Sequence, residues 1–358
     1  MKVVVIGGGI LGASTAWHLR DKADVTVIDC GAIGGLASRA SLGWLNATFY
    51  LNDEHFKLRQ AGIEAWRDLS TKLPNLPLQW SGTIAWDMAD ENRQGMIDRL
   101  RLWDYPVEEL DKNSLKALEP SLIKIPDHAL HLPTEGFVSL SSAADKLLKA
   151  SGAKAYSGIS ARSIEVVSDR VRGVQTDQGM IDADQIVVAA GTATEGIAAS
   201  LDIKIPMLSR PGLMLRTSPA PKSLSNVCAT PDFELLQRDD GKFMLPVSAG
   251  HQSDKSEYIP NLPAKMAEKA MNRLTDFFPH LDLSLEEVML AYRPVPEDEL
   301  PVIGQAGPRG LNFLTMHSAA TLGIIAGECL AKEMLGQDMT NLKPFHPERF
   351  AKKELLVS

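Results

Sequence analysis

The chain has 358 residues, which at roughly 150 residues per domain corresponds to about two domains. Its 44% hydrophobic and 23% charged residues exclude a disordered protein, and a net charge of −8 argues against nucleic acid or anionic lipid as a partner. No stretch approaches about 18 consecutive apolar residues, and the three cysteines lack the spacing of a zinc site or a disulfide framework. Because Met1 also leads directly into a predicted strand and not into a signal peptide, we expect a cytoplasmic protein that does not span a membrane and holds no metal.

The first thirty residues contain the strongest local signal. Residues 2–6 are a β-branched run that predicts a buried strand. The pattern G-x-G-x-x-G follows as Gly7, Gly9 and Gly12, with Ile10 and Leu11 inside it and a predicted helix after it. A second predicted strand, residues 25–28, ends at Asp29 and Cys30, and we expect Cys30 to be a small buried residue and not a catalytic thiol.

These residue types suit a bound dinucleotide. Gly7 permits the tight turn, Gly9 lets the backbone approach a pyrophosphate, and Gly12 lets helix and strand pack closely. The helix N-terminus offers N–H groups to the phosphates, and Asp29, 20 residues after Gly9, can accept from a ribose 2′-OH but would repel a 2′-phosphate. The alternative is a glycine-rich turn without a ligand, which the combination of strand, glycines, helix, strand and acid disfavours. The pattern therefore predicts a dinucleotide other than NADP.

The next segment, residues 31–43, is rich in small residues and lacks helical periodicity. Such a segment can lie along an extended ligand, and its candidate cofactor contacts are Gly35, Ala37, Ser38, Ser41 and Gly43. It runs into Trp44 and Asn46, for which we weigh a place in the substrate pocket against burial in the core.

Further elements follow in chain order. Apolar spacing and capping residues predict helices over residues 52–73, 141–151, 262–278 and 321–335. Short strands are expected within residues 161–189, a buried strand over residues 183–191 ends at Ala190 and Gly191, and further strands are expected over 287–292 and 311–316. Asp239-Asp240-Gly241 between residues 233–238 and 242–245 predicts a hairpin. There is no second G-x-G-x-x-G, so one dinucleotide touched from distant segments fits a flavin better than NAD.

The order of these motifs resembles the FAD-dependent D-amino-acid oxidase superfamily, which holds glycine oxidase, sarcosine oxidase and D-amino-acid dehydrogenase. The resemblance runs nearly end to end. It rests on the N-terminal fingerprint with Asp29, Gly34-Gly35-Leu36-Ala37-Ser38, residues 183–191, Arg293-Pro294 ahead of Pro301-Val302-Ile303-Gly304, Gly310-Leu311-Asn312-Phe313 and Pro344-Phe345-His346-Pro347. The chain departs from the family near the pocket, for example with Met316-His317 in place of Gly-His, which leaves the substrate open.

The resemblance implies an α/β fold that is discontinuous in sequence. A Rossmann-like FAD-binding domain of the glutathione-reductase type is expected from residues 1–75, 135–205 and 300–358. A mixed-sheet substrate domain is expected from residues 76–134 and 206–299, covering the isoalloxazine ring.

The resemblance also suggests which residues act. In related amino-acid oxidases the Arg of the Arg-Pro motif binds the substrate carboxylate, which makes Arg293 the leading substrate ligand, with a structural salt bridge as the alternative. His317 is a candidate contact of flavin or substrate, with a structural role equally weighted. Thr321 and Leu322, at the start of the last helix, are expected near the flavin, while Tyr292 and His251 are weaker pocket candidates.

The implied function is oxidation of the C–N bond of a small amino acid or N-substituted amino acid. The hydride passes to flavin N5, and the resulting imine hydrolyses. In sarcosine-oxidase relatives a Cys near this Arg-Pro motif tethers FAD, whereas Met289-Leu290-Ala291 stands there in this chain, so the resemblance implies non-covalent FAD. The electron acceptor is expected to be O2, a quinone or a partner subunit. One alternative is the catalytic subunit of a multi-subunit opine, proline or hydroxyproline dehydrogenase, and homo- or hetero-oligomers fit either case. A non-catalytic flavin-binding scaffold is the other alternative.

Overall fold

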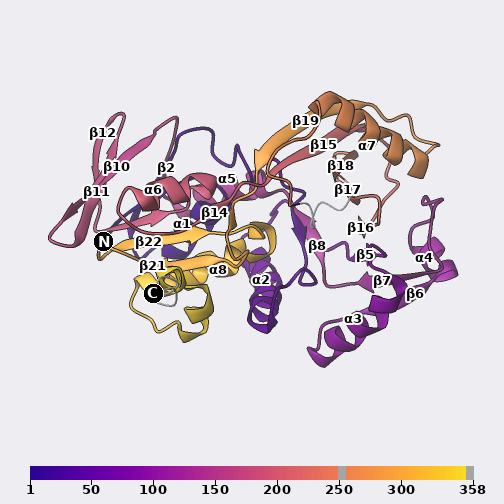
Figure 1. Ribbon diagram of the computed structural model, residues 1–358, viewed down its shortest axis with the longest axis horizontal. Coiled ribbons are helices and arrows are strands. Elements are labelled where there is room, and N and C mark those ends of the chain that lie inside the picture. Colours follow the sequence, from indigo (N-terminus) through magenta and orange to yellow (C-terminus); the bar gives the residue numbers. More distant parts are fainter. Residues whose placement is uncertain (249–254, 352–358) are drawn as a thin grey trace.

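The computed structural model describes residues 1–248 and 255–351, so that His251 lies outside the described residues. Two large sheets with their covering helices dominate the molecule (Figure 1). The first sheet contains β1 and β22, the first and last strands of the described chain. The second sheet lies toward the other end of the long axis.

The first sheet has six strands in the order β21–β22–β13–β1–β2–β9. All neighbouring pairs are parallel except the edge strand β21, which is antiparallel to β22. The strands are β1 (Lys2–Ile6), β2 (Asp24–Asp29), β9 (Lys154–Ser157), β13 (Gln185–Val188), β21 (Val302–Gln305) and β22 (Leu311–Thr315).

Both faces of this sheet are buried, as is typical of parallel sheets. Along β1, Val3 and Val5 pack in one core with helices, and Val4 and Ile6 pack in another with a small antiparallel sheet. The helices of the first core are α1 (Ile10–Leu19), α2 (Asp53–Lys72), α5 (Leu140–Ser151) and α8 (Ala319–Met334). The small sheet comprises β10 (Ala161–Val167), β11 (Arg170–Thr176) and β12 (Gly179–Asp182), with α6 (Thr194–Ala199) nearby in the same core.

The second large sheet has eight strands in the order β19–β15–β18–β17–β16–β5–β7–β6. Its strands are β5 (Thr83–Ala85), β6 (Glu108–Asp111), β7 (His128–Leu132), β15 (Pro211–Pro219), β16 (Val227–Ala229), β17 (Glu234–Gln237), β18 (Lys242–Pro246) and β19 (Leu285–Tyr292). Helix α7 (Pro263–Phe277) packs on one face, and α3 (Asp90–Leu102) and α4 (Lys112–Leu118) lie near the β6 edge (Figure 1).

Two smaller sheets complete the fold. β3 (Trp44–Leu45), β8 (Gly136–Val138) and β4 (Leu78–Gln79) form one, and β14 (Met207–Leu208) pairs with β20 (Val295–Pro296) in the other. β4 follows the boundary expected at residue 76, yet it pairs with β8. The small sheet therefore crosses two of the expected domain boundaries, and the division itself stays a prediction.

The predicted helices are all present, with ends within about two residues of the expected positions, the usual spread between assignments. Asn52 caps α2, because its side chain accepts the His55 N–H at 2.9 Å. The predicted hairpin is the β17–β18 pair, and Gly241 has the positive φ of 80° that the turn demands. Within the described ranges, no helix combines the length and apolarity needed to cross a membrane.

Candidate functional site

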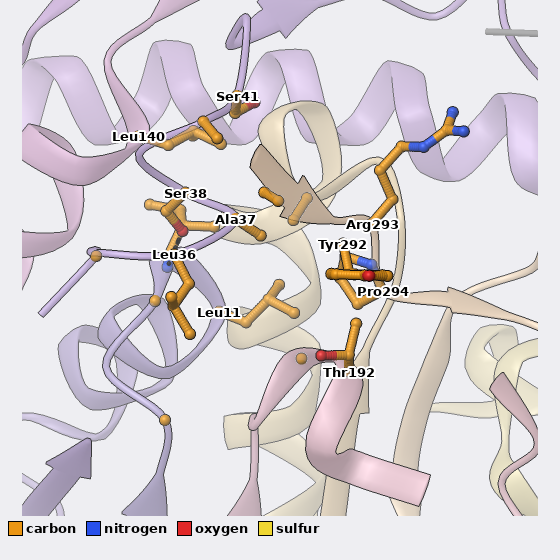
Figure 2. A pocket seen from close by; sticks show the side chains of 18 of the residues that line it. Leu11, Leu36, Ala37, Ser38, Ser41, Leu140, Thr192, Tyr292, Arg293 and Pro294 are labelled. Carbon is orange, nitrogen blue, oxygen red and sulfur yellow. Dashed lines mark hydrogen bonds between the residues drawn. The ribbon is translucent and has the colours of Figure 1, made fainter. Parts of the chain in front are cut away.

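A cavity of about 710 Å3 lies where the carboxyl ends of the central parallel strands meet the second large sheet. Parallel α/β sheets bind ligands at this edge. Its walls come from the fingerprint turn, residues 34–38, 40–44, 189–193, 212–214, 290–294 and 316–321. Figure 2 shows Leu11, Leu36 and Ala37 facing Thr192 and Tyr292 across this space.

The glycines of the first turn are required by close approaches. Gly7 has a φ of 111°, and a Cβ there would lie 2.2 Å from the Ala189 carbonyl oxygen. A Cβ on Gly12 would lie 2.0 Å from the Gly7 carbonyl oxygen, so Gly12 allows α1 to sit against the end of β1. A Cβ on Gly9 would approach only the Ser38 Oγ, at 3.3 Å. Gly9 itself lines the cavity.

The Asp29 carboxylate holds this turn against the next loop. Its Oδ2 accepts the Gly8 N–H and its Oδ1 accepts the Gly31 N–H, both at 2.8 Å. Ser38 Oγ accepts the Ile10 N–H at the start of α1, at 3.2 Å. The loop of residues 31–43 is thus tied to the helix N-terminus from which phosphate-binding N–H groups point.

Most of the residues expected at a cofactor line this cavity. They are Gly7, Gly9, Ile10, Leu11, Asp29, Cys30, Gly35, Ala37, Ser38, Ser41, Gly43, Ala190, Gly191 and Thr321. Gly12 and Leu322 are not among the described lining residues, because Gly12 is covered by Gly7 and Leu322 is buried in the helical core. Cys30 is exposed, contrary to the expectation of burial, since it follows the last paired residue of β2.

Arg293 and Tyr292, at the end of β19, line the cavity. The Arg293 backbone N–H donates to the Arg210 carbonyl at 2.8 Å, and its Nε donates to the same oxygen at 3.5 Å. Figure 2 shows the Arg293 side chain extending away from Thr192 and Leu11, whereas Tyr292 lies beside Pro294. His317 follows β22 and lines the same cavity just ahead of α8.

Trp44 and Asn46 both line the cavity and both are buried. The Trp44 indole N–H donates to Thr83 Oγ1 at 2.8 Å and to Glu135 Oε2 at 3.0 Å. The Asn46 Oδ1 accepts Arg59 Nη2 at 2.6 Å, so its side chain is committed to Arg59. Burial in the core and a place in the pocket were weighed as alternatives for Trp44. Its side chain is both buried and part of the cavity wall.

The sequence patterns did not single out two buried ionisable residues beside these, Arg59 and Glu135. Arg59 is 2% exposed and lines the cavity, and Glu135 is fully buried and accepts the Tyr105 hydroxyl at 2.9 Å. Burial raises the pKa of Glu135 to about 7, although hydrogen bonds from Thr83, Tyr105, Trp44 and Ala47 oppose the shift. Burial likewise lowers the pKa of Arg59 to about 10. The available signal was the position of Arg59 on the apolar stripe of α2, three residues after Phe56 and four before Ile63.

Comparison with known proteins identifies the family. The family model described as "FAD dependent oxidoreductase" (DAO) matches residues 2–333. The chain belongs to this family of FAD-dependent oxidoreductases. It is 25% identical to the hydrogen cyanide synthase subunit HcnC of Pseudomonas protegens, over 98% of this chain and 96% of that protein.

Solved structures of this family share the fold. Glycine oxidase from Bacillus cereus superposes with a TM-score of 0.85 at 19% identity, covering 96% of this chain and 97% of that one. L-proline dehydrogenase from P. horikoshii superposes with a TM-score of 0.86 at 20% identity, covering 98% of both chains. The mixed α/β architecture with parallel and antiparallel sheets is thus the FAD-binding fold of the DAO family.

The residues present fit FAD. The fingerprint turn leaves no room for a Cβ at Gly7 or Gly12, its helix N-terminus opens on the cavity, and Asp29 stands at the end of β2. The largely apolar walls at Leu11 and Leu36 suit a planar ring system. The cofactor of this family is FAD, and the chain is an oxidoreductase.

Proposed function

We propose that the protein oxidises the C–N bond of a small amino acid or N-substituted amino acid, with Arg293 as the carboxylate ligand. The observation that carries this proposal is the placement of a guanidinium-bearing residue at the end of β19, in the cavity wall opposite the fingerprint turn. A guanidinium holds a carboxylate through two parallel hydrogen bonds, which fixes the orientation of the substrate as well as its affinity.

FAD, held by the fingerprint turn and residues 34–38, would supply the acceptor for the hydride that leaves the substrate carbon carrying the nitrogen. The substrate amine must be neutral, so one proton leaves to solvent, and loss of hydride and proton leaves a C=N bond. Water then adds to the imine and releases a keto acid or aldehyde, together with ammonia from a primary amino acid or an amine from an N-substituted one. The protein's role is to hold the substrate in the one orientation that presents this carbon to the cofactor.

The N-terminus of α8 provides the matching electrostatics. Ser318, Ala319 and Ala320 line the cavity at the first turn of this helix, where backbone N–H groups carry partial positive charge. These N–H groups favour negative charge on a ligand at that wall. His317 lies just before this turn, and its side chain is a candidate contact of the flavin or the substrate.

A second candidate is the catalytic subunit of a multi-subunit dehydrogenase that passes electrons to a partner. The similarity to HcnC favours it, because that protein is named as a subunit of a larger synthase. No cluster of three or more metal-binding side chains occurs in the described part of the chain. In this candidate we assign any electron-relay centre to a partner subunit.

Anaerobic mixing of the yellow holoenzyme with a panel of D- and L-amino acids, glycine, sarcosine and proline tests the proposal. We expect at least one to abolish the visible flavin absorption band. Reoxidation by O2 would then identify an oxidase, and reoxidation by a quinone alone would identify a dehydrogenase. A flavin that dithionite reduces but no amine reduces would favour the non-catalytic scaffold.

A further inference from the structure

A second, smaller cavity of about 180 Å3 adjoins the main one. The two share Arg293, His317 and Ser318 as lining residues, so Arg293 stands in the wall between them. The outer cavity is also lined by Arg210 and Lys255.

Cations outnumber carboxylates among the charged residues that line this outer cavity. Of its described lining residues, Arg210, Lys255 and Arg293 are cationic, and Glu299 is the single carboxylate. The Glu299 Oε1 lies 4.0 Å from Lys255 Nζ, which is an exposed pair and screened by solvent. The chain is acidic overall, so three cations that line one small cavity, with Glu299 and the neighbouring Glu257 as counter-charges, are a local feature that can take up an anion.

Arg210 is the best-placed of these cations. Its side chain is only 11% exposed, and its Nη1 donates to the Ser209 carbonyl at 2.9 Å, with Glu257 at the longer distance of 3.8 Å. Its own carbonyl accepts the Arg293 N–H, which fixes the two arginine backbones side by side. Because both residues also line the outer cavity, ligand groups held by Arg210 and by Arg293 would lie in one continuous space.

His55 adds an unused donor. It lines the outer cavity and is 4% exposed, and its Nδ1 accepts the Leu51 N–H at 3.3 Å. The neutral ring therefore carries its proton on Nε2, and this atom is buried with no hydrogen-bond partner among the described residues. A buried N–H without a partner is uncommon in a folded protein and requires an acceptor that is not among the described protein atoms.

We propose that the outer cavity binds a second carboxylate of the substrate, with Arg210 as its main ligand and Lys255 and His55 as secondary donors. The inference rests on the proposed function, since it takes the first carboxylate to be at Arg293. The substrate class is then an amino acid with two carboxylates, the second on the side chain or on the nitrogen substituent.

Two kinds of measurement on the holoenzyme test this proposal. The first is the dissociation constant of glutarate against that of butyrate, from the change that each makes in the flavin absorption spectrum. The second is kcat/KM for iminodiacetate against sarcosine and for aspartate against alanine, which distinguishes the two positions of the second carboxylate. We expect the dicarboxylate of a pair to be favoured by at least about tenfold, the contribution of a charge-assisted hydrogen bond.

Variants locate the effect. Arg210→Gln should reduce the preference for the dicarboxylate over the monocarboxylate about tenfold, because it removes a buried charge. Lys255→Gln should reduce the same preference only roughly two- to threefold, because exposed charges are screened. Arg210→Lys keeps the charge and should retain part of the preference, which guards against a folding defect in Arg210→Gln. Lys149→Gln is the matched control, since it removes an exposed lysine on α5 that is remote from both cavities.

A wild type that binds butyrate as tightly as glutarate, or an unchanged ratio in a folded, FAD-loaded Arg210→Gln variant, would overturn the second-carboxylate site. Failure of the proposed function looks different. In that case no amine reduces the flavin, while the glutarate and butyrate affinities still report on the outer cavity.

Discussion

At each glycine of the first turn, a particular neighbouring atom lies where a side chain would begin. The motif predicted the turn itself, but the partner of Gly7 is the Ala189 carbonyl, which lies 182 residues later and which no local pattern reveals. Gly12 differs, because its partner is the Gly7 carbonyl within the same motif. The sequence therefore predicts the role of Gly12 fully and that of Gly7 in part.

Gly12→Ala should cost the protein much of its FAD and its stability. A Cβ only 2.0 Å from the Gly7 oxygen forces α1 away from β1 and displaces the N–H groups that face the cavity. We expect a loss of about 1–3 kcal/mol in the free energy of unfolding, the usual cost of overpacking. FAD-to-protein ratio and urea denaturation measure this.

Gly95→Ala is the matched control for that variant. Gly95 lies within α3, and a Cβ there meets nothing within 4 Å. Alanine should therefore leave FAD content unchanged and stabilise the helix by about 0.5–1 kcal/mol. Equal behaviour of the two variants would contradict the packing role of Gly12.

At the scale of elements, the helices follow their sequence signals closely. Asn52, the apolar spacing of α2 and the glycine and proline residues between elements place the helix ends, because these are local effects. The polar network under the cavity was not predictable in the same way. Glu135 meets Trp44 and Ala47 across 91 and 88 residues of chain, and only the folded topology joins them.

Glu135→Gln tests how the buried Glu135 carboxyl holds Trp44 of β3, Ala47 and Tyr105 together. Because burial raises its pKa to about 7, Glu135 keeps its proton in the folded state at pH values where the unfolded chain, with a carboxyl near 4.5, has lost it. Its contribution to stability is thus full below pH 4.5 and is lost as the pH rises to about 7. The size is on the order of 3 kcal/mol.

The glutamine variant cannot ionise, so its stability relative to wild type should rise over that pH window. Urea denaturation of both proteins at several pH values between 4.5 and 8 measures the difference. A difference that does not vary with pH over this range would show that folding does not raise the pKa of Glu135.

At the scale of the whole molecule, the cavity is assembled from segments between residue 6 and residue 321. A ligand that touches all of them binds the folded chain and not the unfolded one, so it stabilises the fold by mass action. At a free FAD concentration of about 100 times its dissociation constant, this amounts to about 2.7 kcal/mol. The melting temperature of the holoprotein should exceed that of the apoprotein.

The same assembly needs no covalent bond. We predict that acid or heat precipitation releases intact FAD into the supernatant, since the described cysteines are either buried, as Cys228 and Cys329 are, or beside Asp29, as Cys30 is. Chromatography of the supernatant identifies the flavin. A coloured pellet would contradict non-covalent binding, and FMN in place of FAD would remove the ribose contact expected of Asp29.

We propose that Arg293 holds the substrate carboxylate in the cavity that fits FAD. The most direct test is stopped-flow flavin reduction, without oxygen, as a function of substrate concentration for wild type, Arg293→Lys and Arg293→Ala. A charge-assisted hydrogen bond stabilises a complex by about 1.5–3 kcal/mol, so Arg293→Ala should weaken substrate binding at least about tenfold. Misplacement of the substrate should slow flavin reduction further. FAD content and melting temperature should change little. An unchanged reduction rate and affinity in Arg293→Ala would contradict the carboxylate role, and a collapse of FAD content or folding would instead assign Arg293 to a structural salt bridge.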